Sequence, residues 1–128
     1  MLLLTLTLLM SNLTPEQVSL IDAIIQVESS GNDDAVGDNG KALGCLQIHK
    51  NYWIDSKIPG EHKDCFNRQY ALQVFSSYMT RYAKEAWTDP KKFDPEKIAR
   101  IHNGGPTGYR KEATKKYWKK VKDQLNED

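Results

Sequence analysis

The chain has 128 residues, the size of one compact domain. Apolar residues make up 39% and charged residues 27%, the balance of a globular protein, so the composition argues against a disordered chain. The formal net charge of +1 provides no strong field for nucleic acid, and we expect no nucleic-acid partner.

Residues 1–13 open with an almost unbroken run of Leu and Thr. We interpret this segment as an apolar leader that could be the remnant of a secretion signal, although it lacks a basic start and a small-residue cleavage site. The alternative is a first helical turn packed on the domain. Because the run is too short to span a membrane, we expect no membrane span and one folded domain over residues 14–128.

The first predicted helix begins at Thr14, which can cap it, with Pro15 at the first helical position and Gln17 as the capping-box partner. Helical spacing then places five apolar residues on one face: Val18, Ile21, Ile24, Ile25 and Val27. Gly31 should end the helix. Glu28 therefore falls in the last turn, where loss of water and the negative end of the helix dipole both favour its protonated form. A general acid needs that form; the alternative is an ordinary exposed Glu at a helix end.

Residues 32–42 are rich in turn formers, and Asn39-Gly40 is a strong signal for the tight turn of a β-hairpin. Asp38 stands at the entrance of that turn and returns a second carboxylate toward Glu28. Glycoside hydrolysis needs two carboxylates in different surroundings across one sugar bond. The alternatives are a turn-capping Asp and a calcium loop. The acidic residues here lack the alternate spacing and the Glu at the twelfth place of an EF-hand, so we expect no metal site.

The middle of the chain is predicted to be mostly core. Residues 44–48 form a short apolar run, either a strand or a tight helix. Tyr52 and Trp53 could stack on sugar rings, although such residues more often belong to the core. Residues 65–87 predict a second long helix, because apolar and aromatic residues recur at spacings of three and four.

The last third of the chain predicts two more helices, over residues 94–101 and 109–125. The final helix should face inward with Tyr117, Trp118, Val121 and Leu125. Between them, His102-Asn103-Gly104-Gly105-Pro106 should break the chain sharply. A lone His is more often structural, but a His-Asn pair on such a loop favours a site. The Lys-rich final helix could attract an anionic cell wall or simply present a solvated face. Four helices and one hairpin predict an α+β domain, mostly helical, with a cleft between the helices and the hairpin.

Cys45 and Cys65 are the two cysteines of the chain. They are too few for a disulfide scaffold and badly spaced for a metal site. One disulfide and two buried free thiols both remain open.

The chain resembles the invertebrate-type, destabilase-like lysozymes, a family of the lysozyme-like superfamily. The resemblance runs from about Val18 to Trp118, and the residues 102–106 quoted above are its most specific part. The other shared motifs are Val27-Glu28-Ser29, Asp38-Asn39-Gly40, Gly44 with Gln47-Ile48, Tyr52-Trp53-Ile54-Asp55, residues 78–83 and Arg100-Ile101. The resemblance implies a lysozyme-like fold with a short β-hairpin beside the active-site cleft.

Residue by residue, the resemblance implies that Glu28 is the catalytic acid and that Asp38 is the nucleophile or ion stabiliser of a retaining hydrolysis. The implied substrate is bacterial peptidoglycan, cut at the β-1,4 bond between N-acetylmuramic acid and N-acetylglucosamine. We expect substrate contacts from Tyr52, His102 and Asn103. We further expect a secreted, antimicrobial, monomeric hydrolase with no cofactor and no metal.

The chain departs from the family in two ways. Animal members are rich in cysteine, whereas this chain has two: Cys65 falls at a family position and Cys45 one position past the usual one. Some members also cut ε-(γ-Glu)-Lys bonds with a Ser–Lys pair, whose places are taken here by Lys41 and His49. Because a Lys cannot replace a hydroxyl nucleophile in acyl transfer, we expect no isopeptidase activity by that route.

Two further alternatives to a hydrolase stay open. The chain could be a peptidoglycan- or chitin-binding relative, or an inhibitor decoy, that has lost turnover; retention of both carboxylates argues against this. It could also be a lytic transglycosylase, since those enzymes share part of the pattern around Glu28. They typically use one acid and the sugar's own hydroxyl, so Asp38 favours hydrolysis.

Overall fold

The computed structural model describes residues 12–126, so the predicted leader over residues 1–13 lies outside the described residues except for its last two. The described part contains six α-helices and one two-stranded antiparallel sheet. These elements are α2 (Pro15–Ser29), β1 (Val36–Gly37), β2 (Ala42–Leu43), α3 (Lys50–Ser56), α4 (Arg68–Tyr82), α5 (Lys84–Thr88), α6 (Pro95–Gly104) and α7 (Lys115–Leu125). The α+β, mostly helical prediction is therefore confirmed.

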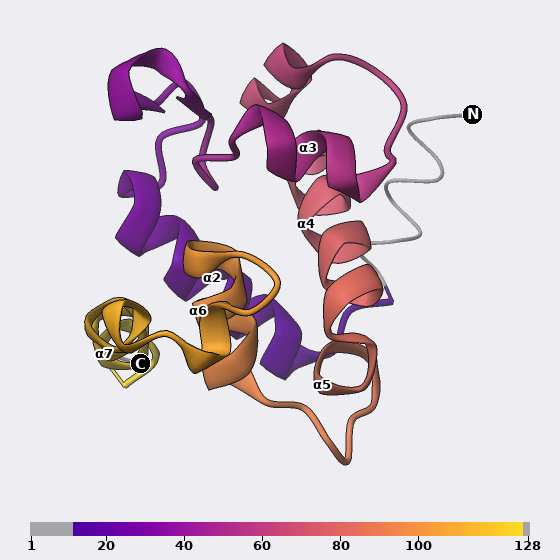
Figure 1. Ribbon diagram of the computed structural model, residues 1–128, viewed down its shortest axis with the longest axis vertical. Helices are drawn as coiled ribbons and strands as arrows, with labels where there is room; N and C mark the ends of the chain where they lie inside the picture. The colour runs from indigo at the N-terminus through magenta and orange to yellow at the C-terminus, as the bar shows by residue number, and fades with distance from the viewer. Residues whose placement is uncertain (1–11, 127–128) are drawn as a thin grey trace.

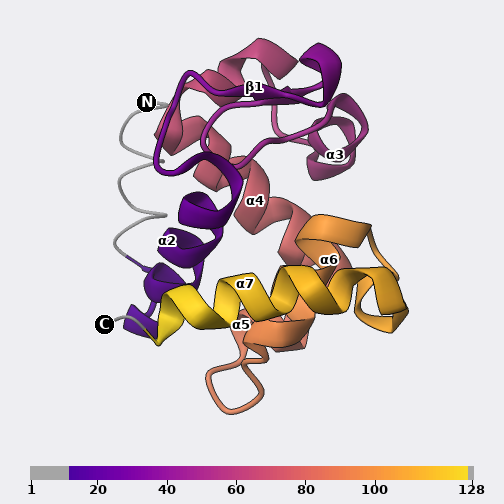
Figure 2. The ribbon, with the colours of Figure 1, turned by 90° about the vertical axis from the view of Figure 1, so that its left-hand side faces the viewer.

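The elements form two parts joined by long helices. Figure 1 shows the hairpin and α3 at the top, α5, α6 and α7 at the bottom, and α2 and α4 running between them. In Figure 2, α7 lies across the molecule, where it packs on both α2 and α6. Helices from distant parts of the sequence therefore meet at the centre of the molecule.

Helix α2 begins as predicted. The Thr14 hydroxyl accepts from the Gln17 backbone N–H at 3.1 Å, and the Gln17 side-chain oxygen accepts from the Thr14 backbone N–H at 2.8 Å. The helix ends at Ser29, and both Ser30 (φ 55°) and Gly31 (φ 86°) adopt the left-handed conformation. Glu28 consequently lies in the last turn, as the sequence predicted.

The second long helix is shorter than predicted. Cys65 lies in a preceding 3-10 turn (His62–Phe66), and α4 begins at Arg68 because the Asn67 side chain caps it by accepting from the Tyr70 backbone N–H at 3.0 Å. The helix stops at Ala83 (φ −149°, ψ 50°), and a separate short helix follows. This break lets Trp87 turn into the core, where its indole N–H donates to the Ser76 hydroxyl at 3.2 Å.

Two predicted boundaries near the C-terminus were wrong. The final helix begins at Lys115, not at residue 109, since two 3-10 turns (Gly108–Arg110 and Glu112–Thr114) come first. Helix α6 continues through His102 and Asn103 to Gly104, so this pair lies in the last helical turn and not on a loop. The next residue, Gly105, terminates the helix, because its φ of 87° and ψ of −173° favour glycine.

The core lies between α2, α4, α6 and the turn at residues 44–48. Its largest fully buried side chains include Trp87, Phe75, Leu20, Ile24, Leu46, Ile48, Met79 and Ile101. Cys45 and Cys65 belong to this core as free thiols, which decides between the two alternatives left open by the sequence. Burial raises the pKa of Cys45 to about 11 and that of Cys65 to about 12.

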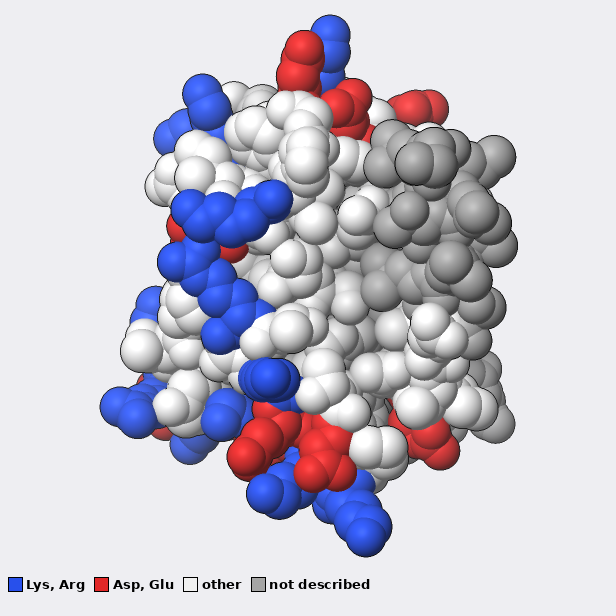
Figure 3. Space-filling view, turned by 90° about the vertical axis from the view of Figure 1, so that its right-hand side faces the viewer, with Lys and Arg blue, Asp and Glu red and all other residues white. Residues whose placement is uncertain are grey.

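The surface carries charges of both signs. Figure 3 shows acidic and basic side chains next to each other at the upper and lower ends of one face. Exposed ion pairs include Lys63–Glu61 at 3.3 Å and Lys92–Glu85 at 3.2 Å. Among residues 12–126, no helix is both long and apolar enough to cross a bilayer.

Candidate active site

Glu28 lies where three distant segments meet. Its side chain, at the end of α2, is 19% exposed. The Tyr117 hydroxyl, from α7, donates to Glu28 Oε2 at 2.8 Å. The Nε2 atom of His102, from α6, lies 3.4 Å from the same oxygen. A phenol and an imidazole from the C-terminal third of the chain thus lie beside one oxygen of this carboxyl group.

His102 is held on both sides of its ring. Its side chain is 2% exposed, its Nε2 lies 2.9 Å from the Leu46 carbonyl oxygen, and its Nδ1 lies 2.9 Å from the Tyr52 hydroxyl. A carbonyl oxygen only accepts, so Nε2 carries the hydrogen. Burial raises the pKa of Tyr52 well above its usual value, so this hydroxyl keeps its proton and donates it to Nδ1. The Leu46 carbonyl thus assigns a hydrogen to Nε2 of His102.

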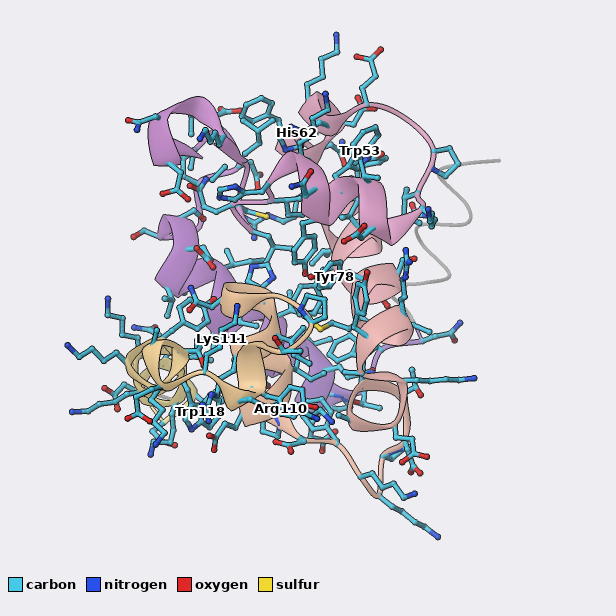
Figure 4. All side chains as sticks on the ribbon, in the orientation of Figure 1. Trp53, His62, Tyr78, Arg110, Lys111 and Trp118 are labelled. Atoms are coloured by element: carbon cyan, nitrogen blue, oxygen red, sulfur yellow. The ribbon has the colours of Figure 1, made fainter. Side chains whose placement is uncertain are left out.

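Two aromatic side chains form the wall beside this histidine. The rings of Tyr52 and Tyr78 stack with centroids 3.7 Å apart and an interplanar angle of 6°. Figure 4 shows Tyr78 near the middle of the molecule, between α3 and α6. Because Tyr78 covers one face of the half-buried Tyr52 ring and His102 takes its hydroxyl, Tyr52 supports His102 as well as being a candidate for sugar contact.

The turn at residues 44–48 connects α2 with α6. The Ser29 hydroxyl, next to Glu28, donates to the Cys45 carbonyl oxygen at 2.8 Å, and His102 donates to the next carbonyl, that of Leu46. Gly44 makes the turn possible, since its φ is 82° and a Cβ there would collide with the Cys65 carbonyl oxygen. This contact explains the need for Gly44 in a run that sequence alone left as strand or helix.

Asp38 is presented by the hairpin. Strands β1 and β2 pair in the register Val36 with Leu43 and Gly37 with Ala42, which confirms the hairpin signal. A 3-10 turn (Asp38–Gly40) joins them, and both Asp38 (φ 50°) and Asn39 (φ 57°) are left-handed. The backbone at the tip of the hairpin therefore determines where this carboxylate lies.

The surroundings of Asp38 are open to water. Its side chain is 69% exposed, and its Oδ2 lies 2.7 Å from Nε2 of His49, whose side chain is 47% exposed. Beside this pair is a hollow of about 330 Å³, lined by Gly40, Lys41, His49, Lys50, Asn51 and His62. A single exposed imidazole is thus the side-chain partner that the described residues give to Asp38.

The five predicted site residues fall into two groups. Glu28, His102 and Tyr52 are joined by hydrogen-bond distances or near contacts, whereas Asp38 lies with His49 on the hairpin side. Asn103 is exposed and follows His102 in the last turn of α6. His102 was predicted to contact substrate. The structure buries its ring beside Glu28, with both nitrogens within hydrogen-bond distance of protein oxygens.

Sequence reasoning missed the role of Tyr117. Helical periodicity placed this residue on the inward face of the last helix and so predicted a core side chain. It lies 89 positions from Glu28, and no local motif links the two residues. Only the packing of α7 on α2 brings the hydroxyl to the carboxylate.

Residues 12–126 hold no cluster of three His, Cys, Asp or Glu side chains suited to a metal ion. Of the two carboxyl groups, Glu28 is mostly withdrawn from water beside a phenol and an imidazole, and Asp38 is exposed.

Comparison with known proteins gives one family and a consistent set of relatives. The Destabilase family model matches residues 18–124. A lysozyme of Magallana gigas is 41% identical over 85 residues, which cover 65% of this chain and 60% of that protein. Lysozyme 1 of Crassostrea virginica is 36% identical over 88 residues, covering 67% of this chain and 46% of the relative. The match thus spans about half the length of these relatives.

Solved structures agree with these relatives in fold. The crystal structure of inhibitor-bound lysozyme from Meretrix lusoria superposes with a TM-score of 0.69 at 34% identity, covering 87% of this chain and 89% of that one. The structure of Tapes japonica lysozyme gives a TM-score of 0.68 at 30% identity, with 80% and 85% covered.

Proposed function

The chain belongs to the destabilase family, and we propose that it is a lysozyme, a glycoside hydrolase that cuts the β-1,4 bond between N-acetylmuramic acid and N-acetylglucosamine in bacterial peptidoglycan. Relatives named lysozyme, at 36–41% identity, support this assignment. The proposal extends their activity to a chain that spans about half of their length.

The contrast between the two carboxyl groups is the observation that carries the proposal. Glu28 is 19% exposed and Asp38 is 69% exposed, so the two carboxyl groups lie in different surroundings. Glycoside hydrolysis through an oxocarbenium-like transition state requires this pairing.

In the proposed cycle, Glu28 gives its proton to the glycosidic oxygen as the bond to the anomeric carbon breaks. Asp38 attacks that carbon or stabilises its positive charge. Glu28, now a carboxylate, then takes a proton from the water that completes the hydrolysis. When Asp38 attacks, the configuration of the anomeric carbon is retained, because Asp38 first replaces the leaving group and water then replaces Asp38.

Substrate contacts by Tyr52 and Asn103 remain part of the proposal, whereas His102 acts through Glu28. We also propose that the protein is a secreted, bacteriolytic monomer. The side chains at 41 and 49 are an ammonium and an imidazole, which argues against isopeptidase activity by the Ser–Lys route.

The test is clearing of a bacterial cell-wall suspension by wild type, Glu28→Gln and Asp38→Asn, with analysis of new reducing ends. We expect Glu28→Gln to lose about 10²–10⁴-fold in rate, as for loss of a general acid. Asp38→Asn should lose about 10²–10³-fold, as for loss of one preorganised electrostatic group. Glu16→Gln, on the same helix, and Asp34→Asn, in the same loop, are matched exposed controls that should keep wild-type rates.

The products separate the remaining alternatives. New reducing ends that both active-site variants fail to form support the two-carboxylate hydrolase. Anhydro-sugar products would instead assign the chain to the lytic transglycosylases. Wall binding without cleavage between pH 4 and pH 8 would leave a sugar-binding relative.

A further inference from the structure

We propose that Tyr117 is a positioning residue for Glu28, and that its hydrogen bond to Oε2 directs the transferable proton of Glu28 to Oε1. This inference rests on the proposed lysozyme function and deepens it, because it states which oxygen of the acid does the chemistry. It also gives the C-terminal helix α7 a part in the reaction.

The Tyr117 hydroxyl and the His102 ring lie beside the same oxygen of Glu28. The Tyr117 hydroxyl lies 2.8 Å from Oε2, and His102 Nε2 lies 3.4 Å from Oε2. Burial, and then the nearby charge of Glu28, raise the pKa of Tyr117 well above its usual value. Tyr117 therefore remains a phenol, and a donor, throughout the range in which a carboxyl group titrates.

The imidazole cannot turn away from this arrangement. Its Nε2 lies 2.9 Å from the Leu46 carbonyl oxygen, and its Nδ1 lies 2.9 Å from the Tyr52 hydroxyl. Its ring also packs against Phe75, with centroids 5.3 Å apart. Its N–H consequently remains on the Oε2 side of the carboxyl group.

Oε1 has no hydrogen-bond partner among residues 12–126. When Glu28 is protonated on Oε1, its carbonyl oxygen Oε2 accepts from Tyr117. Protonation on Oε2 would instead require the Tyr117 hydroxyl to turn and accept, and it would leave Oε1 as a carbonyl oxygen with no donor from these residues. The Tyr117 donor on Oε2 thus favours protonation on Oε1.

The reaction uses this selection in both halves. The proton leaves Oε1 for the glycosidic oxygen, which also takes the electron pair of the broken C–O bond, and Glu28 becomes negative. The Tyr117 hydrogen bond to Oε2 becomes charge-assisted at that moment and hence stronger than in the ground state. Later, Oε1 takes a proton from the water whose oxygen bonds to the anomeric carbon. An interaction that strengthens in the transition state should affect kcat more than KM.

The experiment is the pH dependence of kcat and KM for Tyr117→Phe, measured by reducing ends released from a soluble peptidoglycan fragment. Phe keeps the ring and removes only the hydroxyl. We expect kcat to fall about tenfold and KM to stay within about twofold of wild type. The alkaline limb of the kcat profile should move to higher pH, because the ionised form of Glu28 loses a donor.

Tyr70→Phe is the matched control for a lost buried hydroxyl. The Tyr70 hydroxyl donates to the Pro59 carbonyl at 2.9 Å and accepts from the Trp53 indole N–H at 2.8 Å, and it makes no hydrogen bond to Glu28. This variant should unfold at lower denaturant concentration and keep the wild-type pH profile.

Two results would overturn the inference: a Tyr117→Phe enzyme with wild-type kcat, or one with lowered kcat and an unmoved alkaline limb, as expected of a merely structural hydroxyl. Glu28→Gln, assayed alongside, separates this failure from that of the function. If Glu28→Gln stays active, the lysozyme proposal itself fails; if it is inactive while Tyr117→Phe is normal, only the positioning role is lost.

Discussion

The two carboxyl groups of the candidate site are held in opposite ways. Glu28 lies among α2, α6 and α7, with a phenol and an imidazole on one oxygen, and is 19% exposed. Asp38 lies at the tip of a hairpin with two-residue strands, is 69% exposed and pairs with one exposed imidazole. Tertiary packing positions the first group, and a left-handed backbone positions the second.

This difference shows where each side of the site is sensitive to change. Around Glu28, buried polar groups depend on each other for hydrogen bonds, so loss of one leaves others unpaired. Around Asp38, water can replace a lost partner at little cost. The hairpin depends instead on its root, where Gly44 N–H donates to the Ala35 carbonyl at 2.8 Å and the chain passes close to Cys65.

The largest effect on stability should come from Gly44→Ala at this root. The new Cβ would meet the Cys65 carbonyl oxygen at a φ of 82°, and we expect the free energy of unfolding to fall by about 3 kcal/mol. Gly40→Ala is the matched control at the tip, because its φ is 90° but no atom lies within 4 Å of a Cβ there. It should cost about 1 kcal/mol. Urea unfolding measures both losses of stability. Equal losses would mean that the backbone at Cys65 moves aside for the new Cβ at no cost in free energy.

The comparison is sharpened by replacing a histidine on each side. His102→Phe leaves the Leu46 carbonyl and the Tyr52 hydroxyl unpaired in the interior, and we expect a loss of about 2–3 kcal/mol. His49→Phe removes only an exposed partner of Asp38 and should change stability by less than about 0.5 kcal/mol. A loss of similar size in both variants, by urea unfolding, would contradict the contrast drawn between the two sides.

A third prediction concerns the pH dependence that the two thiols in the core give to stability. Their pKa values of about 11 (Cys45) and 12 (Cys65) exceed the value of about 8.5 for an unfolded thiol. Above pH 8.5 the unfolded chain therefore binds fewer protons than the folded one, so stability is full below that pH and falls as pH rises toward 11–12. We expect a loss of about 1–2 kcal/mol per thiol between pH 8 and pH 10.

Urea unfolding at pH 8, 9 and 10 measures this loss. In Cys45→Ala/Cys65→Ala the overall stability should be lower, but the slope between pH 8 and pH 10 should be smaller than in wild type. An unchanged slope would show that other groups cause the pH dependence.

Much of the fold could be predicted because its signals are local. The capping box at Thr14, the apolar face of α2 and the Asn39-Gly40 turn act within a few residues, and all three are confirmed. Boundaries set by distant contacts could not be predicted: Ala83 breaks a helical pattern so that Trp87 can enter the core, and α6 runs past His102 to Gly104.

The sequence alone determined the place of Glu28 in a last helical turn, the hairpin that presents Asp38, and the family to which the chain belongs, since each depends on residue types at short spacing. The tertiary structure alone decided that His102 is buried beside Glu28. It also decided that Tyr117, 89 residues from Glu28, donates a hydrogen bond to Glu28. It also decided that both cysteines remain free thiols. The physical reason is that hydrogen bonds between distant segments depend on how helices pack, and no local pattern records that packing.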